Sequence, residues 1–287
     1  MEQIKELIDS DYFQDHYHLA ILYDLYGVSV YSMDRKILKT QNAALNTALK
    51  HCRALDRIDL YGLILYHLIL KQKNSSLIDA TQYFEECERS LQKAGAYRRL
   101  IYAKLNKGNI YTKLHHYPLA ERIYQELELS QSQIDEKNII PIVYESYSWC
   151  SLIQEKYEIA LLQAKKAKKA GSKFPDIYIT IVYANYKLGN LEEARQAILE
   201  FRALFSSSPR TDFIQQFFVL LEKRIENKPL PAPLIERLLN QLPDFRDVEL
   251  EMILYPFLTA YYQSIEDYKN ASMIQACWIQ YLQFSQT

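Results

Sequence analysis

Residues 101–134 read IYAKLNKGNIYTKLHHYPLAERIYQELELSQSQI. The apolar residues keep a helical spacing on both sides of the polar HHYP segment, where we expect the chain to turn. The small and aromatic residues that would stand where two antiparallel helices meet are Gly108, Tyr111, Tyr117, Ala120 and Tyr124. Helices approach closely only where small residues replace bulky ones, and large aromatic residues fill the gaps beside such a crossing. The stretch therefore predicts a pair of antiparallel helices.

A second good copy of this pattern occupies residues 174–209, FPDIYITIVYANYKLGNLEEARQAILEFRALFSSSP. Gly189 can take the positive φ that ends a first helix, and Asn190 can cap the second. We expect Ala194 at the close-packing position and Pro209 at the stop of the second helix.

Three further segments repeat the pattern more loosely, at residues 60–95, 139–173 and 251–284. The alanines at the close-packing position are Ala80, Ala120, Ala160 and Ala194, separated by 40, 40 and 34 residues, with Ala271 at the matching place in the last segment. A period of this length is the signature of stacked helical repeats. It also accounts for the 24 tyrosines, most of which we expect to line the seams between helices.

The unit at 101–134 resembles the tetratricopeptide repeat (TPR), which has Leu-Gly-x-x-Tyr in its first helix and Tyr-x-x-Ala-x-x-x-Tyr in its second. The resemblance implies an all-α fold, a right-handed TPR-like helical-repeat solenoid of antiparallel helix pairs. We expect one domain over 1–287, made of an N-terminal helical pair in 1–57 (helices near 12–32 and 36–56), TPR-like repeats in 61–208 and C-terminal helices in 209–287.

Prolines punctuate the C-terminal part of the chain. Pro229, Pro231 and Pro233 forbid a continuous helix and predict a stiff kink near 228–233 inside one domain. We expect Pro233 in the first turn of the next helix and Pro243 at the end of that helix.

Composition limits the classes of function. The chain has 287 residues, of which 49% are hydrophobic, and 34 basic residues against 35 acidic ones give a formal charge of −1. A field that would draw the whole molecule to nucleic acid or to an anionic membrane is therefore absent. The sequence has neither a signal-type apolar start nor a window long and apolar enough for a membrane span, so we expect a cytoplasmic protein.

The sequence contains no Gly-rich phosphate loop, no HExxH and no GxSxG, so we expect no catalytic residue, no metal and no cofactor. The cysteines at 52, 87, 150 and 277 are far apart and lie in helical apolar patterns, which predicts buried structural thiols. The lysine run at 165–173 can be an anion or nucleic-acid patch, but its place late in a helix favours a solvated face that complements the helix dipole.

In the TPR family the first helix of each pair lines a concave groove, and fixed positions of that helix contact an extended peptide. The resemblance carries this role to Tyr102, Asn106, Asn109 and Lys113, with Tyr66 and Lys73 in the preceding repeat and Glu145, Trp149, Tyr183, Tyr186 and Lys187 in the following two. Asparagine amides can hold a peptide backbone through paired donor and acceptor contacts, and aromatic residues can anchor side chains. The alternative is that Asn109 is a common consensus residue and Trp149 is core.

Irregular, Tyr-rich repeats of roughly forty residues are similar to the peptide-sensing TPR domains of Gram-positive quorum-sensing regulators of the Rap, Rgg, NprR and PlcR type. This resemblance implies a regulatory receptor for a short peptide, although residues 1–60 show no convincing helix-turn-helix. A scaffold or adaptor that holds a folded partner is the alternative, and an enzyme on a helical scaffold ranks below both.

The last helix that the sequence predicts carries little charge on an apolar segment. Its large residues are Trp278, Ile279, Tyr281, Leu282 and Phe284. A terminal repeat with an apolar outer face must be capped or paired, so we expect a homodimer contact there.

Overall fold

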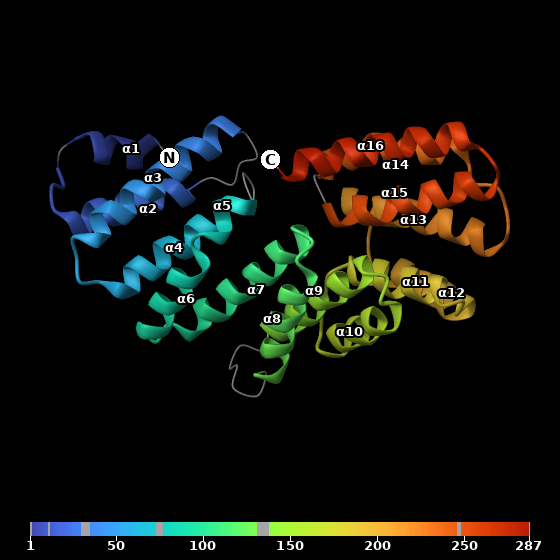
Figure 1. Ribbon diagram of the computed structural model, residues 1–287, viewed down its shortest axis with the longest axis horizontal. Coiled ribbons are helices and arrows are strands. Elements are labelled where there is room, and N and C mark those ends of the chain that lie inside the picture. The colour runs from blue at the N-terminus through green and yellow to red at the C-terminus, as the bar shows by residue number, and fades with distance from the viewer. Residues whose placement is uncertain are drawn as a thin grey trace. The chain divides into compact units, whose positions relative to one another are not determined.

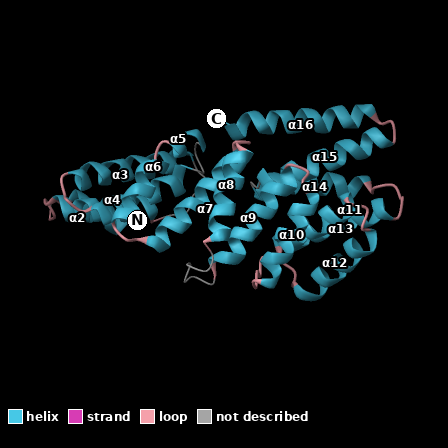
Figure 2. Ribbon diagram, turned by 60° about the horizontal axis from the view of Figure 1, so that its bottom comes forward, coloured by secondary structure: helices cyan, strands magenta, loops and turns pink. Residues whose placement is uncertain are grey.

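The computed structural model describes residues 2–10, 12–29, 35–72, 77–130, 138–245 and 248–286, and throughout them the regular structure is α-helical (Figure 1, Figure 2). The helices are α1 (Glu2–Asp9), α2 (His16–Val28), α3 (Arg35–Arg53), α4 (Ile58–Gln72), α5 (Leu77–Thr81), α6 (Phe84–Lys93), α7 (Tyr97–Lys113), α8 (Tyr117–Leu129), α9 (Ile139–Ile153), α10 (Tyr157–Lys169), α11 (Ile177–Lys187), α12 (Leu191–Leu204), α13 (Pro209–Ile225), α14 (Ala232–Phe245), α15 (Val248–Ser264) and α16 (Tyr268–Gln286). The predicted all-α, TPR-like class of fold is confirmed. None of these helices has an apolar stretch long enough to cross a membrane.

The chain divides into two compact units, residues 1–123 with the last two residues, and residues 124–285. The boundary falls inside α8. In the first unit α2 packs on α3, α3 on α4, and α4 on both α6 and α7. In the second unit α9, α10, α11, α12 and α13 pack in chain order, while α11 also contacts α9 and α13, and α15 contacts α9. The expected single domain over 1–287 stays a prediction.

Small residues stand where helices cross, as the repeat pattern predicts. The alanines at the close-packing position, Ala80, Ala120, Ala160 and Ala194, are fully buried. Tyr124, which follows Ala120 by one helical turn, is fully buried as well. The periodicity in the sequence therefore predicts which residues are buried between the helices of the repeats.

The turn after α11 has the backbone that the sequence predicts but not the predicted cap. Gly189 has a φ of 78°. The Gly189 N–H donates to Tyr186 O at 3.2 Å and the Asn190 N–H to Asn185 O at 2.9 Å, which is the Schellman pattern of a helix end. The side chain of Asn190 makes no capping hydrogen bond, and its Nδ2 donates to Asn185 Oδ1 at 3.3 Å instead. The predicted Asn190 cap is wrong because Asn185 holds its amide.

Two proline predictions are also wrong. α12 ends at Leu204, and Pro209 begins α13 after a capping box in which Ser208 and Thr211 hydrogen-bond reciprocally. Proline suits a first helical position because the missing N–H would have no partner inside the helix. α14 continues through Pro243 to Phe245, since proline in a last turn removes one hydrogen bond without forbidding the helical backbone.

The proline-rich connector contacts the second unit through Leu230, while residues 226–229 are exposed. Pro233 is the second residue of α14, as predicted. Leu230 is buried, and its N–H donates to the Tyr261 hydroxyl at 3.0 Å. The connector is therefore fixed to this unit at Leu230, between the end of α13 at Ile225 and the start of α14 at Ala232. The stiff kink stays a prediction.

The N-terminal part contains the two predicted helices as α2 and α3, with shorter bounds than expected. An additional helix, α1, precedes them and has no fully buried residue. Gly27 of α2 lies so close to α3 that an added Cβ would stand 2.7 Å from Leu45 Cδ2. The absence of a side chain at Gly27 therefore allows α2 and α3 to pack closely.

Candidate functional site

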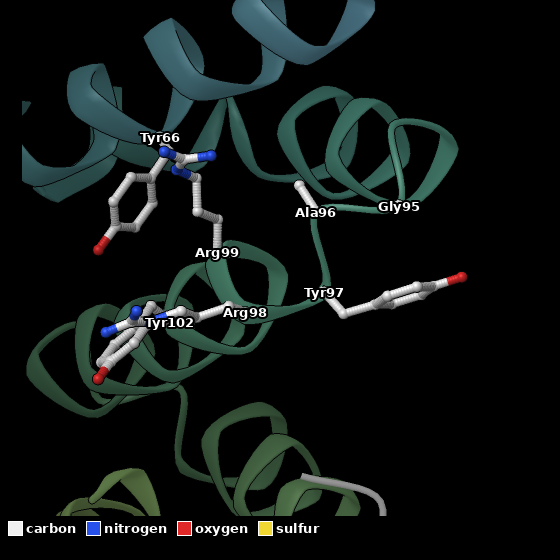
Figure 3. A pocket seen from close by; sticks show the side chains of 7 residues that line it. All are labelled: Tyr66, Gly95, Ala96, Tyr97, Arg98, Arg99 and Tyr102. Atoms are coloured by element: carbon white, nitrogen blue, oxygen red, sulfur yellow. The ribbon is translucent and has the colours of Figure 1, made fainter. Parts of the chain in front are cut away.

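The first unit contains a hollow of about 460 Å³ where the turn between α6 and α7 meets α4 (Figure 3). Its lining residues are Tyr66, Gly95, Ala96, Tyr97, Arg98, Arg99 and Tyr102. We call this site the Tyr–Arg hollow. It combines two cations with phenol rings, and none of its seven lining residues is acidic.

The local backbone places both arginines at the start of α7. Gly95 has a φ of 66°, and the next N–H, of Ala96, donates back to Leu91 O at 2.9 Å, which ends α6 and reverses the chain. α7 then begins at Tyr97 without a side-chain cap. Because residues three and four apart share a helix face, Arg98 and Arg99 lie on the same face as Tyr102.

The three phenols of the hollow differ in orientation (Figure 3). Figure 3 shows the hydroxyls of Tyr66 and Tyr102 pointing to the same side of the hollow, while Tyr97 turns the opposite way. Burial raises the pKa of Tyr66 above its usual value, and Tyr102 adds to the rise, while Arg99 opposes it. The Tyr66 hydroxyl therefore keeps its proton at neutral pH.

Several predicted groove residues lie along α7 in one half-buried stripe. Tyr102, Asn106, Asn109 and Lys113 follow at spacings of four, three and four residues, the repeat of one helix face. Asn106 Nδ2 donates to Tyr102 O in the preceding turn at 2.8 Å. We call these four residues the α7 stripe. Tyr102 belongs both to the stripe and to the hollow, whereas Lys73 lies outside the described residues.

Two of the five predicted groove residues of the second unit are packed inside it. Trp149 is 5% exposed and Tyr183 is 6% exposed, and both belong to the core. The Tyr183 ring lies 6.2 Å from that of Phe217 and 6.4 Å from that of Phe257, between ring centres. These positions favour the alternative interpretation of Trp149 as core and extend it to Tyr183.

The other three predicted groove residues of the second unit remain partly accessible. Tyr186 is half-buried and packs against Phe257, with ring centres 6.3 Å apart. Lys187 is exposed, and its Nζ lies 5.5 Å from the ring centre of Tyr157. Glu145 is half-buried, and its backbone carbonyl accepts a hydrogen bond from Ser148 Oγ at 2.7 Å. Peptide binding by Tyr186, Lys187 and Glu145 stays a prediction.

The lysine run takes part in ion pairs between helices. Lys166 Nζ lies 2.5 Å from a carboxylate oxygen of Glu128, and Lys168 Nζ lies 2.5 Å from one of Glu200. Both acidic residues come from neighbouring helices, α8 and α12. The pairing favours the structural interpretation of this run over an anion-binding patch.

Three of the four cysteines fit the prediction. Cys52, Cys87 and Cys150 are buried, and burial raises the pKa of Cys52 to about 11 and that of Cys87 to about 12. Cys277 is exposed, so the prediction of a buried thiol is wrong there. α16 buries Ala271 and Ile274, and the helical spacing overestimated how far this buried stripe continues.

The predicted dimer helix is described only in part. Ile279 is 56% exposed and Trp278 is half-buried, while the side chains of Tyr281, Leu282 and Phe284 lie outside what the structure describes. The homodimer contact stays a prediction.

Sequence reasoning missed the two arginines of the hollow. The repeat was counted from Ile101, whereas α7 begins four residues earlier at Tyr97. The signal in the sequence is the pair Arg98–Arg99, which follows the turn at Gly95 and falls in the first turn of α7. Their partner Tyr66 is distant in sequence, and only the packing of α7 on α4 brings it near.

No family model matches the sequence, and neither does any curated protein. Among solved structures, the chain is similar to the apo form of the quorum sensor NprR from B. thuringiensis, with a TM-score of 0.74 and 13% identity over 97% of this chain and 80% of that one. NprR in complex with its cognate peptide NprX gives a TM-score of 0.56 and 15% identity over 96% and 81% of the two chains.

Two further structures have the same fold. Aspartyl phosphate phosphatase F from Bacillus subtilis gives a TM-score of 0.75 and 16% identity over 95% of this chain and 72% of that one. A Rap protein complexed with competence and sporulation factor gives a TM-score of 0.70 and 14% identity over 99% and 81%. The predicted resemblance to Rap and NprR proteins is thus confirmed at the level of the fold.

Proposed function

We propose that this chain is a cytoplasmic regulatory receptor that binds a short peptide along the α7 stripe. The observation that carries the proposal is the meeting of Tyr66 and Tyr102 in one hollow. Both are groove positions by the TPR count, and they come from first helices of successive repeats. A peptide as the ligand is supported by the similar fold of NprR, a quorum sensor that forms a complex with its cognate peptide.

The length of the stripe suits a short extended peptide. From Tyr102 to Lys113 the helix advances eleven residues, about 16 Å at the rise of an α-helix. An extended chain covers that length with about five residues. Asn106 and Asn109 lie in the middle of this path, where their amides can pair with a peptide backbone.

The proposal assigns no catalysis to the chain, and the alternative remains a scaffold that holds a folded partner. An exposed terminal face suits that alternative, since Met273 and Ile279 of α16 are both more than half exposed. A scaffold of this kind would bind a folded protein and ignore short peptides.

The test is native mass spectrometry of the purified chain with pooled hydrophobic heptapeptides, supported by thermal shift. We expect bound peptides with the wild type and loss of binding in the Asn106→Ala, Asn109→Ala double variant. Asn46→Ala is the matched control, because Asn46 Nδ2 makes the same type of hydrogen bond to the preceding turn, to Asn42 O at 3.0 Å. Retention of all peptides by the double variant would contradict the proposed groove, and capture of a folded protein alone would favour the scaffold.

A further inference from the structure

We propose that the Tyr–Arg hollow is a carboxylate-binding subsite, in which Arg98 and Arg99 hold the anionic group of a bound peptide and Tyr66 and Tyr102 donate hydrogen bonds to it. The inference deepens the proposed function, on which it rests for the identity of the ligand as a peptide. The shared chemistry is a carboxylate, supplied either by the C-terminus or by an acidic side chain.

Charge is the first argument. Arg98 and Arg99 stand exposed at the edge of a hollow whose lining contains no carboxylate. The charge of Arg99 acts on the ring that faces it, since Arg99 opposes the rise in the pKa of Tyr66 that burial causes. The planar fork of a guanidinium matches the two oxygens of a carboxylate. An anion that enters the hollow therefore meets positive charge beside hydrogen-bond donors.

The two phenols supply the remaining contacts. Tyr66 comes from α4 and Tyr102 from α7, so a group bound between them contacts both helices. Their hydroxyls point to the same side of the hollow (Figure 3). A protonated phenol donates a stronger, charge-assisted hydrogen bond to a carboxylate than to the neutral carbonyl oxygen of an amide. The hollow therefore discriminates a free acid from its amide.

Size and position are the third argument. A volume of about 460 Å³ lies in the range of small-ligand pockets and holds the last residue or two of a peptide. Tyr102 connects the hollow to the α7 stripe, so a peptide that lies on Asn106 and Asn109 reaches the hollow with one end. The subsite fixes the direction and register of the bound peptide, which the contacts of Asn106 and Asn109 to its backbone alone do not fix.

The first experiment uses N-acetyl-phenylalanine as a probe, as the free acid and as the amide, titrated into the full chain and followed by NMR. We expect the acid to bind to the wild type at millimolar concentration, about tenfold or more tightly than the amide does. The Arg98→Gln, Arg99→Gln variant should bind the acid about tenfold or more weakly than the wild type does. Tyr66→Phe and Tyr102→Phe should each weaken binding of the acid by a smaller factor. Arg89→Gln is the matched control, since Arg89 is exposed in the same unit and does not line the hollow.

Three results would overturn the carboxylate subsite: equal affinity for the acid and the amide, binding of neither, or an Arg98→Gln, Arg99→Gln variant that binds the acid as the wild type does.

A second experiment separates this inference from the proposed function. Three heptapeptide pools are compared: free acids without Asp or Glu, amides with one internal Asp or Glu, and amides without either. Retention of only the first pool or only the second supports the subsite and identifies the source of the carboxylate.

The remaining outcomes differ for the two proposals. Retention of all three pools in a manner that depends on Asn106 and Asn109 supports the receptor and overturns the subsite. Arginine-dependent binding of the small acid without retention of any peptide supports the subsite and contradicts the receptor.

Discussion

Replacing Gly27 by alanine tests the tight crossing of α2 and α3. An alanine Cβ at this position would stand 2.7 Å from Leu45 Cδ2 and 3.2 Å from the backbone oxygen of Gln41. Leu45 is fully buried and the Gln41 oxygen belongs to the backbone of α3, so neither atom can move away cheaply. The two helices must separate, or Leu45 must leave its rotamer.

The expected size follows from two opposing effects. Overpacking of a filled core costs about 1–3 kcal/mol, and we take the upper half of this range because Leu45 is fully buried and one of the close atoms is backbone. Alanine has a helix propensity better than glycine by about 1 kcal/mol, which offsets part of that cost. We expect Gly27→Ala to lower the free energy of unfolding by about 1–2 kcal/mol.

The assay is urea unfolding followed by far-UV circular dichroism, extended to a double-mutant cycle. Leu45→Ala alone should cost about 2–5 kcal/mol because it leaves a cavity. In the Gly27→Ala, Leu45→Ala variant the new methyl group enters that cavity, so the combined loss should be smaller than the sum of the single losses. A Gly27→Ala variant as stable as the wild type, or more stable, would refute the close crossing.

Other changes test the helix ends, the connector and a histidine pair. Glu155 has a φ of 59°, so Glu155→Gly should raise the free energy of unfolding by about 0.5–1 kcal/mol in urea titrations, and an unchanged midpoint would contradict the strain. Tyr261→Phe leaves the buried Leu230 N–H without its acceptor and should cost about 1–3 kcal/mol by the same assay, whereas a neutral result would mean that water replaces the hydroxyl. Burial, and then His16 with its Nδ1 3.0 Å away, lower the pKa of His51 below its usual 6.5. Because the folded chain then binds fewer protons than the unfolded one, stability should fall as pH drops below 6.5, and thermal unfolding of His16→Ala should show a smaller fall than that of the wild type.

The repeat architecture can be predicted from the sequence because the patterns that specify it, alanine spacing and turn residues, are local. The spacing of Ala80, Ala120, Ala160 and Ala194 predicts the crossings, and all four residues are buried where helices meet. The backbone turn at Gly189 follows from its permissive φ. Such features depend on propensity and on the 3.6-residue period, which neighbouring residues already contain.

Contacts between segments that are distant in the sequence cannot be predicted from local patterns. Whether Trp149 faces a groove or a core depends on which helices cover α9, and both α11 and α15 do so. The Asn190 side chain does not cap α12 as expected, because its amide hydrogen-bonds to Asn185 across the turn. Local periodicity identifies the apolar face of a helix without identifying what lies against it.

The Tyr–Arg hollow shows the same division. Helical spacing places Tyr102, Asn106 and Asn109 on one face of α7 from the order of residues alone. The meeting of Tyr66 with Arg98 and Arg99 required α4 and α7 to pack side by side, although α5 and α6 separate them in the chain. A helix face is set by a period, whereas a binding site is set by which faces the tertiary packing brings together.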